Sequence, residues 1–433
     1  RLTLKPFIIA MKQYHPTRYA GWLACFTLLS YLLSVASLLP ADVATVSAWL
    51  TLFTMLPAVK ASARKQSVVL FLLGVTGLAT GYWLGAEISW RSVFAANVPL
   101  LTMFVAITFL SLTNAPDNDE RLPTGNKAAA VTAFGTTLLG AVINMSVIFV
   151  FGDRLKRGGK LTDAQQIILA RCFTAAAWWS PFFIATGVAL MYAPGMAWKA
   201  TVAPGAIMAL LGIGYTLVDV HRRSTAPFEG YPLKAESLII PVLMAIAVLI
   251  LHHFFPQIRI MILISLLSVL GALLFMQERP RWLTLKDFVD NRLHSAGPQF
   301  ALFLAAGVFS AGIKAMIALY PNLIDLHQFS FDASMFAVIL ALMIIAGLLG
   351  VHPVISIAVV SPVLLPLNPN TTSLGFMFLS TWAISTGSGP LSGIGLILTG
   401  RYGASSRRII ANNWHYIVTM WALACLVNAV LLA

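Results

Sequence analysis

Acidic residues are scarce in this chain, and none lies at the centre of a long apolar stretch. The 433-residue sequence has 15 Asp and Glu against 28 Lys and Arg, and only 10% of its residues are charged. A carboxylate inside the membrane is the usual charge carrier of proton- and cation-translocating sites. Its absence argues against cation antiport and a carboxylate proton relay. It also leaves little chemistry for an intramembrane enzyme, so no enzymatic activity is expected.

Cysteine is rare as well. The chain has three, Cys25, Cys172 and Cys425, and they lie far apart in apolar runs. This scatter fits neither a disulfide framework nor a metal site. The sequence therefore predicts no bound metal and no cofactor.

The excess of basic residues gives a net charge of +13, which could suggest a nucleic-acid partner. Their distribution argues otherwise, because they collect in short loops near 60–65, 154–160, 222–234, 279–286 and 401–408. Such clusters are typical of the cytoplasmic side of a membrane protein, where they meet anionic headgroups. We expect membrane lipids as partners and no nucleic acid.

What the chain has in abundance is apolar sequence. Apolar residues make up 59% of it, and its mean hydropathy is +0.85, far above that of a soluble domain. Runs long enough to span the hydrocarbon layer occur near 20–39, 44–59, 67–85, 92–113, 128–151, 197–218, 236–254, 258–276, 298–320, 333–350 and 409–432. The expected fold is an all-α polytopic membrane protein with about 11 transmembrane helices.

A short pattern occurs in both halves of the chain. Leu-Leu-Gly at 138–140 and a serine precede Pro181, and Leu-Leu-Gly at 348–350 and a serine precede Pro390 at nearly the same spacing. Repeated broken segments of this kind are a strong sequence signal for a transporter's binding site. The sequence thus predicts two inverted repeats, each with a re-entrant hairpin, near 164–193 and near 372–400.

The repeat divides the chain into four predicted parts. These are N-terminal scaffold helices (1–91), a first repeat (92–219), connecting helices with an interfacial amphipathic helix (220–297) and a second repeat (298–433). The proline-interrupted run at 351–367 is expected to continue the helix before it. With hairpins entering from both sides, the basic loop at Arg401–Arg408 is expected to face away from other basic loops.

The second predicted hairpin has the most side chains suited to binding a ligand. Its hydroxyls can bind a ligand, and its glycines let the backbone approach that ligand closely. A half-helix starting near Pro390 would aim free N–H groups at an anion, and the half-helix before it could hold Na⁺ with its last carbonyls. The first hairpin repeats this design with fewer hydroxyls. Predicted substrate-binding residues are Ser180, Pro181, Thr186, Ser385, Thr386, Gly387, Ser388, Gly389 and Ser392.

Small residues and hydroxyls also allow close helix packing in membranes, which is the competing interpretation. Lys314 follows a glycine-interrupted stretch, and because a lysine there is costly unless it lines a cavity, it is predicted to bind substrate. Arg171 either faces an anionic substrate or reaches out to the surface. Asn144 and His352 occupy parallel places in the two halves. They are candidates for ion coupling, or for hydrogen bonds between helices.

The broken Ser/Gly/Pro segment in each half resembles the ion transporter superfamily, which includes divalent anion/sodium symporters, gluconate permeases and large membrane subunits of tripartite transporters. Ser388–Gly393 looks most like a second-hairpin tip of these proteins. The resemblance implies a homodimeric, elevator-type secondary transporter whose two tips enclose the substrate. The Ser-Asn-Thr signature of dicarboxylate symporters is missing, since Trp179–Pro181 and Gly387–Gly389 stand in its place.

Three functions remain open. The first is secondary transport of a small anionic solute in the bacterial inner membrane, driven by Na⁺ or H⁺. The second is an exporter or flippase-like pathway for a neutral or lipid-like solute, suggested by the bulky segment Trp178–Phe183. The third is a membrane subunit that works only with a partner protein.

Overall fold

The fold is described from a computed structural model, which covers residues 16–113, 121–233, 238–319 and 330–432. The helices are α2 Pro16–Val35, α3 Ala41–Met55, α4 Ala61–Trp83, α5 Trp90–Ala95, α6 Val98–Thr108, α7 Asn126–Ile143, α8 Ser146–Leu155, α9 Asp163–Ala175, α10 Ile184–Tyr192, α11 Trp198–Arg223, α12 Ile239–Phe254, α13 Ile260–Phe275, α14 Arg281–Asp287, α15 Gly297–Leu319, α16 Ala333–Leu348, α17 Pro353–Leu364, α18 Thr371–Ser388, α19 Gly393–Tyr402 and α20 Ser406–Leu431. Within these residues, seven helical stretches are long and apolar enough to cross a membrane, and five shorter helices are apolar. The predicted all-α polytopic fold is confirmed.

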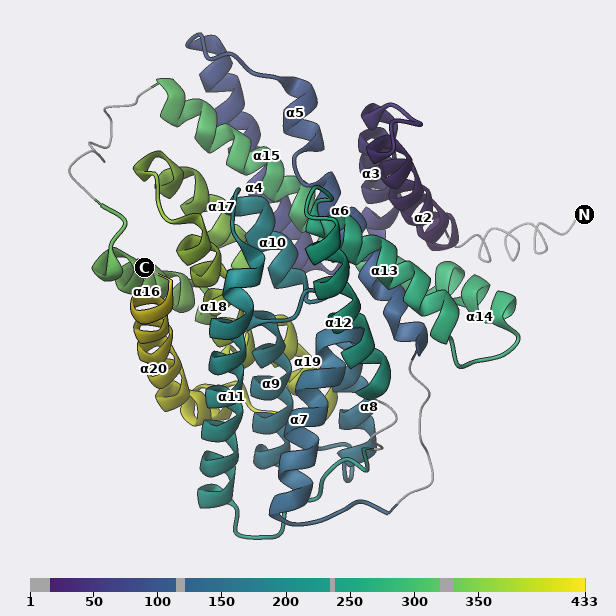
Figure 1. The fold of residues 1–433 in the computed structure, drawn as a ribbon, viewed down its shortest axis with the longest axis vertical. Coiled ribbons are helices and arrows are strands. Elements are labelled where there is room, and N and C mark those ends of the chain that lie inside the picture. Colours follow the sequence, from purple (N-terminus) through teal and green to yellow (C-terminus); the bar gives the residue numbers. More distant parts are fainter. Residues whose placement is uncertain (1–15, 114–120, 234–237, 320–329, 433) are drawn as a thin grey trace, which may run out of the picture.

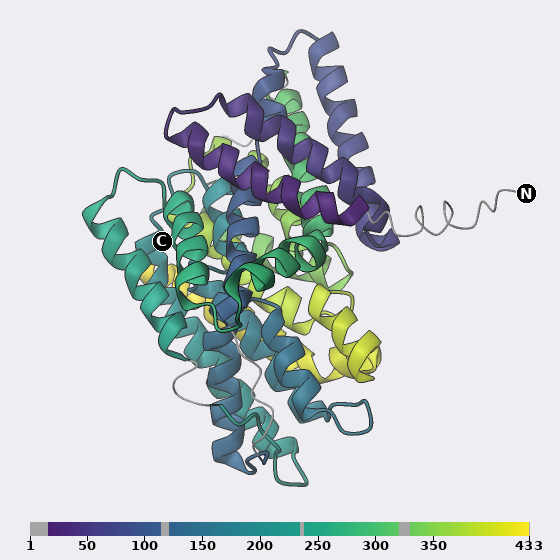
Figure 2. The same ribbon diagram turned by 90° about the vertical axis from the view of Figure 1, so that its right-hand side faces the viewer.

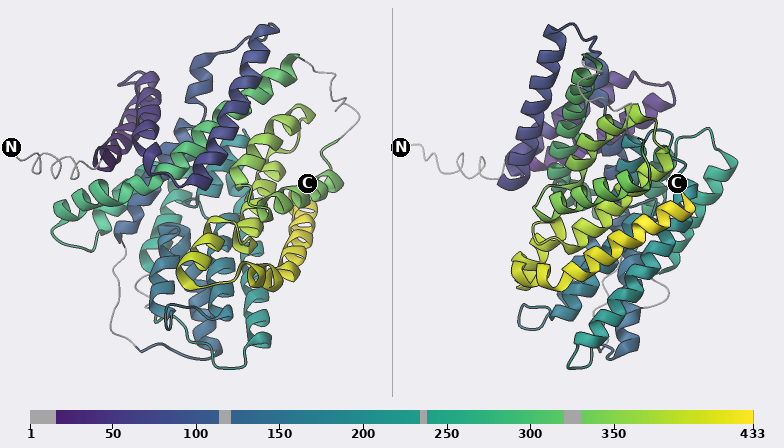
Figure 3. Two further views of the ribbon diagram at one scale, coloured as in Figure 1. Left: turned by 180° about the vertical axis from the view of Figure 1, so that it is seen from behind. Right: turned by 90° about the vertical axis from the view of Figure 1, so that its left-hand side faces the viewer.

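The helices gather into two regions along the long axis of the molecule. Figures 1 and 2 show the N-terminal helices α2–α5 towards one end, with α7 and α11 reaching the other end. In the view from behind, Figure 3 shows that the C-terminal helices α16–α20 are packed together. In the first region α4 and α15 touch backbone to backbone, because Gly74 lies directly against Phe309 and Gly312. Small residues allow this close approach in membrane helices.

Two re-entrant hairpins are present, but on other segments than the sequence predicts. The expected span at 128–151 turns back between α7 and α8, and the stretch 333–367 turns back between α16 and α17, with the two arms of each pair packed together. The chain reverses at Asn144 (φ 52°) and Gly350 (φ 95°). Both have a positive φ, which glycine adopts most readily; at Asn144 the ψ is −141°.

The segments predicted as hairpins, 164–193 and 372–400, are instead helices broken in the middle. α10 follows α9 along the long axis of the molecule (Figure 1). The Leu161 N–H, just before α9, donates to the carbonyl of Tyr402 at the end of α19. At the other side, the Ala197 N–H, after α10, donates to Thr372 at the start of α18. The broken helices α9–α10 and α18–α19 therefore run antiparallel across the molecule.

The hairpins enter from opposite sides. The Tyr402 hydroxyl donates to Asp153 Oδ1, at 3.2 Å, at the open end of the α7–α8 hairpin. Ser361, in the returning arm of the α16–α17 hairpin, donates to the carbonyl of Tyr192 at the end of α10, at 2.6 Å. The predicted inverted relation between the halves is present, with each hairpin preceding its broken helix.

This arrangement removes a conflict in the charge pattern. With the broken helices crossing completely, the loops after α8, α11 and α19 share one side, and three ion pairs join them: Arg401–Asp153 at 2.7 Å, Arg408–Asp163 at 3.2 Å and Arg157–Glu229 at 3.3 Å. The expectation that Arg401–Arg408 faces away from the other basic loops was wrong, because it followed from misplaced hairpins. We call this side the basic face.

The ion pair at the basic face makes a prediction for acid stability. The hydrogen bond from Arg401, with help from Lys156, holds the pKa of Asp153 at about 2, below its usual 3.8. A depressed carboxyl pKa stabilises the fold above the unfolded-state pKa, and the contribution is lost as pH falls through the folded-state pKa. We expect Asp153→Asn to lower the unfolding temperature at pH 6. The difference from the unaltered chain should shrink steadily between pH 3.8 and about 2.

Candidate functional site

Four interruptions of the helices meet at the centre of the molecule. We call the two hairpin turns the first tip (144–145) and the second tip (349–352). The interruptions of the two broken helices are the first break (179–183) and the second break (389–392). Met145 of the first tip lies against Gly393, next to the second break, and Gly350 of the second tip lies against Leu391. The two halves therefore meet through these four segments.

Hydroxyls of the first break are fully used in shaping it. Ser180 Oγ donates to the carbonyl of Ala141 at 2.7 Å and accepts from the N–H of Phe182 at 3.2 Å. Thr186 Oγ1 donates to the carbonyl of Ser180 at 2.7 Å. These side chains and Pro181 are buried. They satisfy backbone groups that the broken helix leaves open, so they position the break.

The first tip offers a free acceptor. Asn144 Nδ2 donates to the carbonyl of Phe182 at 3.2 Å, which fixes the orientation of the amide. Its Oδ1 has no hydrogen-bond partner in the part of the chain that the structure describes, and the side chain is half-buried. An amide oxygen in this position can accept from a ligand or coordinate a cation.

The second break is held in the same way as the first. Ser392 Oγ lies 2.7 Å from the carbonyls of Thr386 and Gly389 and accepts from the N–H of Gly395 at 3.0 Å. Thr186 in the first half and Ser392 in the second half each bond a carbonyl six residues earlier. The same number of residues separates Asn144 from Thr186 as separates Gly350 from Ser392. The two halves thus share one design in one register.

Two hydroxyls at the second break have no partner within the described residues: Thr386 Oγ1 and Ser388 Oγ. Ser388 is fully buried, and Thr386 is half-buried. Ser385, by contrast, donates to the carbonyl of Thr381 at 2.7 Å. A buried hydroxyl without a partner is costly, which marks Thr386 and Ser388 as the hydroxyls available to a ligand.

Thr386 lies beside the second tip. It is one helical turn after Trp382, on the same face of α18, and the Trp382 ring lies 5.3 Å from the His352 ring. His352 caps α17 by accepting the Val354 N–H at 3.3 Å through Nδ1. Trp382, which the sequence reasoning missed, gives this part of the site an aromatic wall.

The second break packs tightly on its surroundings through glycine. Gly387 lies directly against Thr174 of α9, and Gly389 lies against Gly347 at the end of α16. A scaffold residue that the sequence reasoning also missed reaches the second tip: Gln66 of α4 donates to the carbonyl of Gly350 at 3.0 Å. Its polar side chain next to an apolar run was the available signal.

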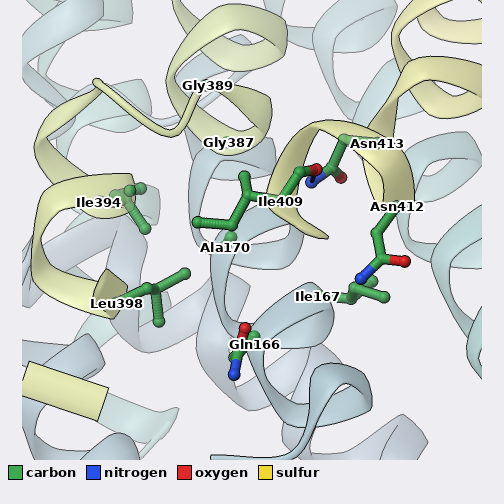
Figure 4. Close-up of a pocket in the computed structure, with 11 residues that line it drawn as sticks. Gln166, Ile167, Ala170, Gly387, Gly389, Ile394, Leu398, Ile409, Asn412 and Asn413 are labelled. Atoms are coloured by element: carbon green, nitrogen blue, oxygen red, sulfur yellow. Dashed lines mark hydrogen bonds between the residues drawn. The ribbon is translucent and has the colours of Figure 1, made fainter. Parts of the chain in front are cut away.

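Behind the second break, facing α9 and α20, is a small cavity (Figure 4). It measures about 10 Å³ and is lined by Gln166, Ile167, Ala170, Gly387, Gly389, Ile394, Gly395, Leu398, Ile409, Asn412 and Asn413. This is room for about one water molecule, so it cannot hold an organic solute. No group of three His, Cys, Asp or Glu side chains among the described residues is placed to hold a metal ion.

The two basic residues singled out in the sequence, Arg171 and Lys314, lie outside the tips and breaks. Arg171 is buried and donates to Asn413 at 2.7 Å, to Asp219 at 3.0 Å and to the Asn412 carbonyl at 2.7 Å. It therefore ties α9 to α11 and α20. Lys314 is exposed on α15, in the part of that helix that packs on α4. The structure does not bring Lys314 to the tips and breaks.

Comparisons with known proteins agree with this architecture. No family model and no curated protein matches the chain. Among solved structures, it is similar to the Alcanivorax borkumensis YdaH transporter, described as having an unusual topology, with 13% identity and a TM-score of 0.50 over 96% of this chain and 98% of that chain. At this identity the similarity shows the fold. The chain is an integral, multi-pass membrane protein with the fold of a membrane transporter.

Proposed function

We propose that the chain is a secondary transporter of a small anionic solute, driven by Na⁺ or H⁺. One observation carries the proposal: two hairpins enter from opposite sides, and their tips meet two helix breaks at the centre. Broken helices of this kind place the binding sites of secondary transporters near the middle of the bilayer. The YdaH protein, whose fold the chain shares, is described as a transporter.

The helix ends at the site favour an anion. The half-helices α8, α10, α17 and α19 all begin at the tips and breaks, so the positive ends of their dipoles point to the centre. The N–H groups of Gly393 and Ile394 have no partner among the described residues, and Gly393 is exposed. The tips and breaks contain no Asp or Glu that would repel a negative solute.

Oxygen atoms at the same place support a coupling cation. Asn144 Oδ1 and the carbonyls of Gly387 and Ser388 are unpartnered within the described residues. Na⁺ bound by such neutral oxygens would compensate the charge of the anion in a site with no counter-ion of its own. Because each ion compensates the charge of the other, binding of Na⁺ and binding of the anion would each strengthen the other, which is the physical basis of the proposed coupling.

The proposed motion is of the elevator type. The hairpins and broken helices form one tightly connected unit, which meets the scaffold helix α4 through the Gln66–Gly350 hydrogen bond at the second tip. A sliding movement would break and remake such contacts. We propose a homodimer in the bacterial inner membrane, with the basic face towards the cytoplasm.

An amphiphilic solute is the second candidate. Apolar side chains gather at or beside the tips: Leu391 is exposed, Met145 and Trp179 are half-buried, and the buried Trp382 lies against His352. A lipid-like solute would bind to these apolar side chains without Na⁺, and its affinity would increase with the length of its apolar chain. The ion dependence of binding therefore distinguishes the two candidates.

Thr386→Val tests the site with a change of one hydroxyl. Because Thr386 Oγ1 is buried without a partner among the described residues, on a residue that is half-buried as a whole, we expect the variant to fold normally and to bind the anion about tenfold more weakly, as for loss of one hydrogen bond to a charged group. Thr399→Val is the matched control, since Thr399 Oγ1 donates to the Gly395 carbonyl at 2.9 Å away from the tips. Equal affinity in both variants would contradict the assignment.

The function itself is tested by thermal stability of the purified protein against a panel of organic and inorganic anions, each with Na⁺ or with choline. A ligand at ~100 times its Kd adds about 2.7 kcal/mol to the stability. Stabilisation by an anion only with Na⁺, followed by Na⁺-driven uptake into proteoliposomes, supports the proposal. Stabilisation by long-chain amphiphiles without Na⁺ supports the second candidate.

A further inference from the structure

The scaffold contains a broad apolar groove, called the cavity below, which is open to the outside and remote from the tips and breaks. It has a volume of about 580 Å³ and lies between α3, α4 and α5, lined by Asp42, Thr45, Val46, Trp49, Leu50, Phe53, Phe71, Trp90, Arg91 and Phe94. A volume of this size is typical of sites that hold an organic ligand. Several of the lining side chains, including Phe53, Leu50 and Val46, are exposed, so the cavity opens to the outside of the chain.

The cavity is polar at one end and apolar along the rest. Two polar side chains within the wall are already used, because Thr45 donates to the Ala41 carbonyl at 3.3 Å and Trp49 Nε1 donates to the Phe94 carbonyl at 3.0 Å. The remaining charge is the exposed pair of Arg91 and Asp42, at 2.6 Å. Arg91 has further donors to offer beyond this bond.

The length of the apolar wall matches one leaflet of a bilayer. Asp42 is at the start of α3 and Phe53 is near its end, and eleven residues of helix span ~16 Å. Half of the hydrocarbon layer of a bilayer is ~15 Å thick. Asp42 and Arg91 therefore stand where a headgroup would lie when an acyl chain follows α3 towards Phe53.

We propose that this cavity is a binding site for a zwitterionic phospholipid of the phosphatidylethanolamine type. The phosphate would accept from Arg91, the ammonium would donate to Asp42, and an acyl chain would lie along Val46, Leu50 and Phe53. A pair of opposite charges matches a headgroup that carries both signs, whereas a net anionic headgroup leaves the Asp42 carboxylate facing negative charge.

The test uses the purified, delipidated full chain in detergent, titrated with phosphatidylethanolamine or phosphatidylglycerol, with bound lipid counted by native mass spectrometry. We expect about a fivefold tighter apparent Kd for phosphatidylethanolamine, the equivalent of ~1 kcal/mol for one charge at a membrane surface. Asp42→Asn should remove the preference, and Arg91→Gln should weaken both lipids. Glu87→Gln, an exposed carboxylate that does not line the cavity, is the control and should change neither.

Equal affinity for the two lipids in the unaltered chain would overturn the proposal. So would a loss of dimer in Phe53→Ser with lipid binding unchanged, because the cavity would then be covered by a second copy of the chain. Both lipid measurements are independent of solute transport. Failure here therefore leaves the proposed function untouched.

Discussion

Replacing Arg171 by methionine is expected to lower the free energy of unfolding by about 3 kcal/mol or more, because a charged donor is lost and buried acceptors are left unsatisfied, although Asp219 keeps its ion pair with Arg223 at 2.6 Å. The guanidinium makes three hydrogen bonds to α11 and α20 and lies 4.4 Å from the centre of the Tyr416 ring. Methionine fills part of the volume but leaves Asn413 Oδ1 without its donor. Denaturant unfolding of the purified protein measures the loss.

Two further variants make this result specific. Arg408→Gln removes a basic residue whose side chain is 70% exposed and pairs with Asp163, so a change within ~1 kcal/mol is expected. Arg171→Lys keeps the charge but cannot reproduce the planar set of bonds, and it should recover only part of the loss. A negligible effect of Arg171→Met would mean that the three helices are held together by apolar packing alone.

Asn144→Gly is expected to weaken Na⁺-dependent anion binding, with at least a tenfold rise in Kd, while leaving the fold intact. Glycine adopts the φ of 52° without strain, so the backbone of the first tip is kept and only the amide is removed. The lost bond to Phe182 and the relieved strain are both of the order of ~1 kcal/mol and oppose each other. Binding and unfolding are measured on the same preparation.

The chain offers a matched control for that substitution. Asn368 also has a positive φ, of 50°, but it is exposed after α17, away from the tips. Asn368→Gly should leave anion binding and its Na⁺ dependence unchanged. If Asn144→Gly also binds as the unaltered chain does, the amide of the first tip has no part in the site.

Much of the architecture could be predicted because the lipid environment constrains it. A chain with so few charges has to satisfy its backbone in helices. The repeated glycine–proline pattern indicated two related halves, but in the wrong register, because in the structure Gly350 corresponds to Asn144 and not to Gly140. The hairpins could not be placed correctly, because a re-entrant arm and a crossing helix are equally apolar. The reversal at Asn144 depends on the backbone conformation of one residue within an apolar run, which hydropathy does not report.

The site was predicted in part for a similar reason. Hydroxyls mark both breaks, but the sequence does not show which are used internally, as for Ser180 and Ser392, and which are free, as for Thr386. Lys314 was singled out from the cost of a buried charge, yet it is exposed. Gln66 is a polar residue beside an apolar run, but it comes to the second tip only through tertiary packing, so that local pattern does not indicate its role.

The shared register of the two halves has a consequence for the proposed transport cycle. An inverted duplication means that one hairpin with its broken helix, seen from one side of the membrane, approximately repeats the other pair seen from the opposite side. In this structure the second tip is joined to α4 by Gln66, while the first tip bonds within its own half. If the proposed function holds, the opposite-facing state would need no new architecture, since it would follow when the two halves exchange their environments. A solute leaving the protein would then meet the counterpart of the hairpin that admitted it.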